Sequence, residues 1–154
     1  VRYRADHPKA SPAAQALGPG RRPPRRPAAA EPMAYAPARS ESSASSLRVA
    51  YHLPCHLKAQ QVGSPAVTLL QEIPGVEVID LAAGCCGMAG TFGMKKGTYE
   101  RSLEMGRPLF ERVVEVTPNF IVSECSTCRE QLAHATGFPV VHPIVLLAEA
   151  YGVR

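Results

Sequence analysis

The chain has 154 residues, enough for one ordinary domain, with a formal net charge of +4, five cysteines and 15 prolines. Residues 1–46 contain eight Lys or Arg and three Asp or Glu, giving +5, whereas residues 47–154 contain nine and ten, giving −1. The basic charge therefore gives no reason to expect a nucleic-acid partner for the cysteine-containing part. No apolar run reaches the roughly 20 residues of a membrane-spanning helix, and no signal-peptide core follows the N-terminal charges. We expect a cytoplasmic protein without direct membrane insertion, which reaches the inner face of the membrane only through partners.

Residues 1–46 differ in composition from the rest of the chain. They hold eight of the 15 prolines and almost no large aliphatic residues, so they cannot bury enough apolar surface to offset the entropy of ordering. The arginine run at 21–26 has no interleaved aromatic residues for base stacking, which favours a solvated linker over a nucleic-acid arm. The sequence predicts a disordered Pro/Ala/Arg-rich tail.

The first predicted elements are a strand, a helix and a second strand. An extended apolar stretch at 47–53 predicts the first strand, which the turn residues 54–56 close. Ser64 is a good helix N-cap, Pro65 suits a first helical turn, and Pro74-Gly75 ends the predicted helix. The second predicted strand is 76–81.

A glycine-rich loop at 82–97 follows the second strand. It matches neither GxGxxG nor GxxxxGK[ST], which favours close backbone packing around a metal centre over phosphate binding. Apolar residues at helical spacing then predict a helix from about Thr98 to Val114. Because Gly106 and Pro108 lie within it, we expect this helix to be kinked or split in two.

The last predicted elements continue the alternation. They are a strand at 120–123, a helix that begins at the Cys125–Cys128 motif and ends before Gly137, a short strand at 140–141, and a helix from Pro143 to Tyr151. Alternating strands and helices are typical of an α/β fold with a small parallel sheet, built from Rossmann-like βα repeats.

The cysteines follow the predicted strands. Cys55, the pair Cys85-Cys86, and Cys125 each come just after a strand, and Cys128 follows Cys125 on the first turn of a helix. Because the carboxyl ends of parallel strands share one edge of a sheet, these thiols are expected to converge there. The helix N-terminus favours thiolate over thiol, which is the form that binds metal. An odd number of cysteines without an export signal indicates metal or redox chemistry rather than structural disulfides.

Three kinds of site can use a CxxC motif: zinc sites, thiol–disulfide enzymes and iron–sulfur clusters. Adjacent cysteines such as Cys85 and Cys86 rarely form a disulfide with each other, and five thiolates exceed what one tetrahedral zinc ion can bind. An iron–sulfur cluster suits them better, because each of its irons needs a terminal ligand. A zinc-binding interaction module that uses four of the cysteines, and a thiol–disulfide redox protein that uses Cys125 and Cys128, remain alternatives.

Residues 49–152, about two thirds of the chain, resemble the cysteine-rich CCG domain family of heterodisulfide reductase and of glycolate and lactate oxidation iron–sulfur subunits. Four segments carry the resemblance: Pro54-Cys55-His56, Gly84-Cys85-Cys86-Gly87-Met88-Ala89-Gly90-Thr91-Phe92-Gly93, Glu124-Cys125-Ser126-Thr127-Cys128 and His142-Pro143-Ile144. The extended glycine-rich loop and the His-Pro-Ile ending resemble most the branch of the family found in anaerobic glycerol-3-phosphate dehydrogenase.

The resemblance implies a function and a ligand set. In such proteins the motif cysteines hold a 4Fe-4S cluster, non-cubane in the heterodisulfide reductase branch, and here these ligands would be Cys55, Cys85, Cys86, Cys125 and Cys128. The cluster would carry electrons from a flavin-containing dehydrogenase subunit, which holds the FAD, toward a quinone-linked membrane subunit or another acceptor. The chain would then be an oxidoreductase subunit that carries no catalytic residues for substrate turnover.

Members of this family normally carry two copies of the cysteine motif and an upstream ferredoxin-like segment. This chain has one copy and no cysteine upstream of Cys55. The resemblance therefore implies that residues 47–154 form one CCG iron–sulfur domain, corresponding to the C-terminal portion of such a subunit.

The histidines of this region lead to separate expectations. His56, beside Cys55, either donates a hydrogen bond to a cluster sulfur or simply completes the turn, and the sequence does not favour one of these. His142 precedes Pro143 and is expected at the start of the last helix. His52 and His134 are expected to be structural.

Overall fold

In the computed structural model of the protein, residues 46–153 are described. The predicted disordered tail, residues 1–46, lies outside the described residues except for Ser46. Among the described residues, no helix is both long enough and apolar enough to cross a membrane.

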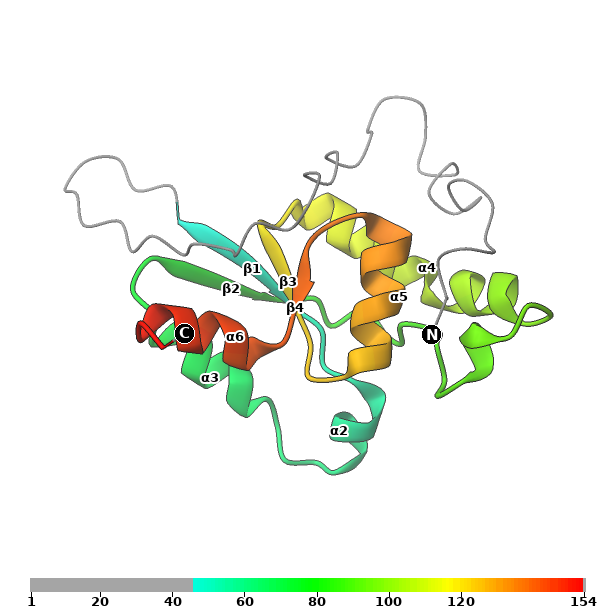
Figure 1. Ribbon diagram of the computed structural model, residues 1–154, viewed down its shortest axis with the longest axis horizontal. Coiled ribbons are helices and arrows are strands. Elements are labelled where there is room, and N and C mark those ends of the chain that lie inside the picture. The colour runs from blue at the N-terminus through cyan, green and yellow to red at the C-terminus, as the bar shows by residue number, and fades with distance from the viewer. Residues whose placement is uncertain (1–45, 154) are drawn as a thin grey trace.

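A four-stranded parallel sheet forms the centre of the described region (Figure 1). Its strands are β1 (Leu47–Tyr51), β2 (Val76–Asp80), β3 (Phe120–Val122) and β4 (Val140–Val141). They lie in the order β2-β1-β3-β4, and every neighbouring pair is parallel. The predicted α/β fold is thus confirmed. Strand β1 lies between β2 and β3, so the segment that follows β1 emerges between the segments that follow those two strands.

Helices cover both faces of this sheet (Figure 1). Helices α3 and α6 pack on one face, and α4 and α5 pack on the other. The helical elements are α2 (Cys55–Ala59), α3 (Pro65–Gln71), the 3₁₀ helix η1 (Phe92–Met94), α4 (Tyr99–Val116), α5 (Ser126–Thr136) and α6 (Pro143–Ala150). Helices on both faces allow each parallel crossover to return over the sheet.

Three local predictions are corrected by the structure. The turn predicted at 54–56 is instead the start of the short helix α2, because the carbonyl of Pro54 accepts hydrogen bonds from the amides of Leu57 and Lys58. Ser64 does occupy the N-cap position of α3, but its side chain makes no capping hydrogen bond. Strand β1 ends at Tyr51, two residues earlier than expected.

Helix α4 runs without a break through Gly106 and Pro108, so the prediction that it splits in two is wrong. A proline inside a helix costs roughly 3 kcal/mol in lost hydrogen bonding and steric conflict. One buried stripe continues across this position and supplies the opposing packing energy: Tyr99, Ser102, Leu103, Gly106, Leu109, Phe110, Val113 and Val116. Tertiary packing, more than helix propensity, decides where a protein helix persists.

The side chains of β1 alternate between the two faces. Val49 and Tyr51 pack with α3 and α6, whereas Ala50 packs with α4 and α5. Both sets are fully buried. A period of two places the next side chain, that of His52, on the same side as Ala50.

The glycine-rich loop is pressed against α4. Gly87 has φ +84°, and a Cβ there would lie 1.9 Å from the carbonyl oxygen of Ser102. A Cβ on Gly106 would lie 2.5 Å from the carbonyl oxygen of Cys86. The close backbone approach that the glycines predict is therefore an approach to helix α4, and it fixes the position of Cys86.

Ser102 joins α4 to α5 beneath this loop. Its fully buried hydroxyl donates to the carbonyl of Tyr99 at 2.7 Å and accepts from Nε2 of Gln131 at 3.0 Å. Ser102→Ala leaves the buried amide of Gln131 without this partner, so we expect it to lower the free energy of unfolding by about 1–3 kcal/mol. Urea unfolding of the reduced, metal-free protein measures the change.

The matched control is Arg101→Ala, since Arg101 is the exposed neighbour on the same helix. This change is expected to alter the unfolding free energy by less than about 0.5 kcal/mol. Equal effects of the two substitutions would show that the Ser102–Gln131 hydrogen bond does not contribute to the packing of α4 on α5.

Candidate metal centre

Three segments bring the five cysteines to one edge of the sheet. Cys55 begins α2 after β1, Cys85 and Cys86 lie in the loop after β2, and Cys125 and Cys128 lie at the start of α5 after β3. Because these strands are parallel neighbours, the predicted placement of the cysteines after neighbouring strand ends is confirmed, and the sulfurs of Cys86 and Cys128 are in contact. The thiols are also close enough to influence one another: after burial, Cys86 and Cys55 raise the pKa of Cys85, and the hydrogen bond with Cys86, burial and then Cys125 raise the pKa of Cys128.

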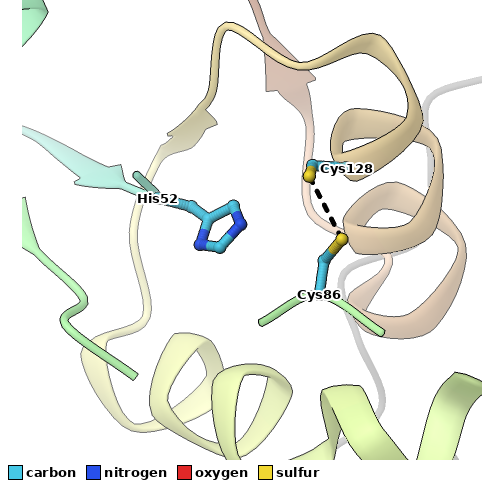
Figure 2. Close-up of side chains that lie close together, drawn as sticks. All are labelled: His52, Cys86 and Cys128. Atoms are coloured by element: carbon cyan, nitrogen blue, oxygen red, sulfur yellow. Dashed lines mark hydrogen bonds between the residues drawn. The ribbon is translucent and has the colours of Figure 1, made fainter. Parts of the chain in front are cut away.

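Cys86 and Cys128 form the buried part of the site (Figure 2). Their sulfur atoms lie 3.1 Å apart and share a hydrogen bond, and the residues are only 2% and 3% exposed. The hydrogen bond with Cys128 lowers the pKa of the Cys86 thiol, against the opposing effect of burial. The same hydrogen bond, together with burial, raises the pKa of Cys128. The pKa values of these two buried thiols are therefore shifted in opposite directions by the hydrogen bond that joins them.

Cys125 is the N-cap of α5, so the predicted position of the motif at a helix N-terminus is confirmed. Its sulfur accepts from the amide of Cys128 at 3.4 Å and lies 3.1 Å from the hydroxyl of Thr127. Burial alone raises the pKa of Cys125, but the hydrogen bonds from Thr127 and Cys128 outweigh it and lower the pKa overall. A helix N-terminus thus stabilises the thiolate that a metal requires.

Cys85 is half-buried and has the opposite tendency. Burial raises the pKa of its thiol, and the amide of Gly87, which donates to its sulfur at 3.3 Å, opposes this only in part. The two half-buried cysteines of the site, Cys85 and Cys125, therefore differ in thiol acidity at similar exposure.

This difference predicts a pH-dependent order of thiol modification in the reduced, metal-free protein. The thiolate is the reactive form, so the lowered pKa of Cys125 and the raised pKa of Cys85 give Cys125 the larger thiolate fraction at neutral pH, and the two fractions approach each other in alkali. We expect iodoacetamide to label Cys125 several-fold faster than Cys85 at neutral pH, with the ratio shrinking in alkali. Mass spectrometry of the peptides measures both rates. Faster labelling of Cys85 at neutral pH would contradict this order.

Hydrogen bonds from two side chains hold the segment before Cys125 in position. The hydroxyl of Tyr51 donates to Oε1 of Glu124 at 3.1 Å, and Nη1 of Arg129 donates to the carbonyls of Ser123 and Glu124, both at 3.0 Å. Burial, followed by the charge of Glu124, raises the pKa of Tyr51 to about 12, so its hydroxyl stays a donor throughout the neutral range. These contacts hold Cys125 in place relative to the central strand.

His52 belongs to the site, a placement that the sequence interpretation missed. A ring nitrogen of His52 and the sulfurs of Cys86 and Cys128 all lie within 4.8 Å of one another, and all three residues are buried. The signal available in the sequence is the two-residue alternation of β1, which places His52 on the face of Ala50.

Within the part of the chain that the structure describes, the other histidines are not in the buried group of His52, Cys86 and Cys128. His56 is exposed on α2. His142 is the N-cap of α6, where its Nδ1 accepts from the amide of Ile144 at 3.1 Å, so its predicted position at the start of a helix is confirmed. His134 contacts the hydroxyl of Tyr99 across α5 and α4.

The donor set fits an iron–sulfur cluster. All five cysteines are free, and their sulfurs are soft ligands of the kind that hold such clusters. Two are buried, two are half-buried and one is exposed, so the site reaches from the core to the surface. The Nε2 atom of His52, which has no hydrogen-bond partner among the described residues, is a further buried polar atom beside the sulfurs.

Known proteins are similar to this chain over the region that contains the cysteines and His52. The sequence model of the CCG cysteine-rich domain matches residues 49–133, which is more than half of the chain. The chain belongs to the CCG cysteine-rich domain family. The matched range contains all five cysteines and His52, and it extends from β1 into α5.

Three curated relatives illustrate the similarity of this CCG domain. One subunit of the anaerobic glycerol-3-phosphate dehydrogenase from Escherichia coli (strain K12) is 41% identical over 104 residues, which cover 68% of this chain and 26% of the relative. One subunit of the fumarate reductase (CoM/CoB) from Methanothermobacter marburgensis is 31% identical over 86 residues, covering 54% and 17%. Lactate utilization protein A from Geobacillus sp. (strain WCH70) is 32% identical over 84 residues, covering 53% and 34%.

The CCG domain thus spans about a quarter of the length of the glycerol-3-phosphate dehydrogenase relative, with 26% of that protein covered. No solved structure matches the chain.

Proposed function

We propose that residues 47–154 form an iron–sulfur domain that transfers electrons within an oxidoreductase, with a 4Fe-4S cluster held by Cys55, Cys85, Cys86, Cys125 and Cys128. The observation that carries this proposal is the placement of five free thiols after three neighbouring parallel strands, with the sulfurs of Cys86 and Cys128 buried in contact. The cluster would supply one-electron chemistry, and the chain supplies its sulfur ligands and their surroundings.

The arrangement favours a cluster over a single zinc ion. A structural zinc site is closed by four ligands, and the chain offers five thiols at this edge, two of them on adjacent residues. Adjacent thiols can serve two different irons of one cluster without the strained ring that a disulfide between them requires.

The exposure of the cysteines suggests a direction for electron transfer. Cys86 and Cys128 anchor the cluster on the core side, whereas Cys55 lies on α2, a helix without buried residues. The cluster edge beside Cys55 is therefore the one open to a partner, and electrons enter or leave most directly there.

The relatives suggest the kind of enzyme in which this domain works. They are named as subunits of a dehydrogenase and of a reductase and as a lactate utilization protein. We propose that a partner subunit with FAD oxidises glycerol 3-phosphate or a 2-hydroxy acid, and that this chain passes the electrons toward quinone through a membrane subunit or toward another acceptor. A cytoplasmic location at the inner face of the membrane is part of this proposal.

Anaerobic reconstitution of the full chain with iron and sulfide tests the proposed function. We expect a brown protein whose visible absorption bleaches on reduction with dithionite and returns on reoxidation, with an EPR signal in one of the two states. A colourless protein with one zinc ion would support the zinc-binding module instead. A metal-free protein with a reversible disulfide between Cys125 and Cys128 would support the thiol–disulfide protein.

A further inference from the structure

His52 is held at the centre of the site by its backbone. Its amide donates to the carbonyl of Val122 on β3 at 3.0 Å, and the carbonyl of the preceding Tyr51 accepts from Leu81, just after β2, at 3.0 Å. His52 therefore stands between the two segments that deliver the buried cysteines. The position is set by the sheet and not by a flexible loop.

The imidazole of His52 points from the end of β1 toward the sulfurs of Cys86 and Cys128 (Figure 2). The residue is only 3% exposed, and its Nε2 has no hydrogen-bond partner within the described part of the chain. A buried polar group without a partner is energetically unfavourable, so such groups usually have a partner in the functional state. Two acceptors of suitable chemistry lie close by, since the sulfurs of Cys86 and Cys128 are both within 4.8 Å of a ring nitrogen of His52.

We propose that His52 is a positioning residue of the cluster site, whose Nε2–H donates a hydrogen bond to the thiolate of Cys86. This inference rests on the proposed function. The five cysteines fill the ligand positions, so the imidazole is the donor next to them and not a sixth ligand. A hydrogen bond to a ligand sulfur stabilises the reduced cluster more than the oxidised one, because the reduced cluster carries more negative charge. His52 therefore raises the reduction potential.

Three substitutions test this role. His52→Leu removes the donor, and His52→Gln keeps a side-chain N–H with similar reach. His56→Leu makes the same chemical change at an exposed histidine beside Cys55. We expect His52→Leu to lower the reduction potential in an EPR-monitored titration, His52→Gln to restore most of the difference, and His56→Leu to cause little change.

Electron–nuclear double resonance on the reduced protein provides a readout independent of activity. We expect an exchangeable proton coupled to the cluster in the unchanged protein and in His52→Gln, and its loss in His52→Leu. If His52→Leu does not fold or load iron, the reduction potential of His52→Gln and the coupling of its exchangeable proton to the cluster still test the proposal.

Two results would overturn the proposal. A strong nitrogen hyperfine coupling that disappears in His52→Gln would make His52 a ligand of iron. Equal potentials in all four proteins, with the exchangeable proton retained in His52→Leu, would leave His52 no role at the cluster. Failure of the proposed function is recognised separately, because the unchanged protein would then contain no iron–sulfur cluster to titrate.

Discussion

Cys86→Ser is expected to lose most of its cluster, with iron and acid-labile sulfide per chain at least about tenfold below the unchanged protein. The Cys86 sulfur lies 3.1 Å from that of Cys128 and is 2% exposed, so no neighbouring group can replace it from solvent. A serine hydroxyl is a shorter and harder ligand than a thiolate. Iron and sulfide analysis after anaerobic reconstitution measures the loss.

Ser126→Ala is the matched control for this experiment. Ser126 lies between Cys125 and Cys128 but is exposed, so its loss is expected to leave the iron content unchanged. Circular dichroism of the metal-free proteins shows whether each variant is folded. If folded Cys86→Ser kept full iron, sulfide and visible absorption, the adjacent Cys85-Cys86 pair would not supply two ligands, and a simpler site built on the CxxC motif would be favoured.

Gly87→Ala has the largest expected effect on stability. Gly87 adopts φ +84°, and an added methyl group would lie 1.9 Å from the carbonyl oxygen of Ser102, which is backbone and cannot rotate away. The left-handed conformation costs a non-glycine residue about 1–2 kcal/mol and overpacking costs about 1–3 kcal/mol more. We expect a loss of about 2–5 kcal/mol and a Tm at least about 10 °C lower, measured by thermal unfolding of the metal-free protein.

Gly97→Ala is the control from the same glycine-rich segment. Gly97 has an ordinary φ, and a Cβ there would meet nothing within 4 Å. Its replacement is expected to change Tm by no more than a degree or two. Similar melting of the two variants would show that the loop is not pressed against α4 at Gly87.

Much of the fold could be predicted because local signals agree with tertiary packing. The strands form within the apolar stretches that predict them, and the helix start at Pro65 and the helix end at Gly137 occur where the sequence indicates them. The unbroken course of α4 could not be predicted, because glycine and proline, here Gly106 and Pro108, are residues that usually interrupt a helix. Only the three-dimensional contact of Gly106 with the backbone of Cys86 shows why glycine is needed there.

The candidate site, like the fold, could be predicted from the sequence only in part. The order of strands and cysteines suffices to place Cys55, Cys85 and Cys125 at one edge, since parallel strand ends coincide. The contact between Cys86 and Cys128, and the inclusion of His52, depend on strand order and on which face each side chain occupies. The local sequence pattern does not determine the strand order. The sequence therefore offers no reason to place His52 at the site, and from the sequence alone His52 is expected to have a structural role.

X-ray absorption at the iron edge of the anaerobically reconstituted protein tests most directly whether the five cysteines hold a cluster. We expect a first shell of sulfur neighbours and a second shell of iron neighbours, both lost in Cys86→Ser. Iron surrounded by nitrogen and oxygen, without neighbouring iron, would contradict an iron–sulfur cluster at this edge of the sheet.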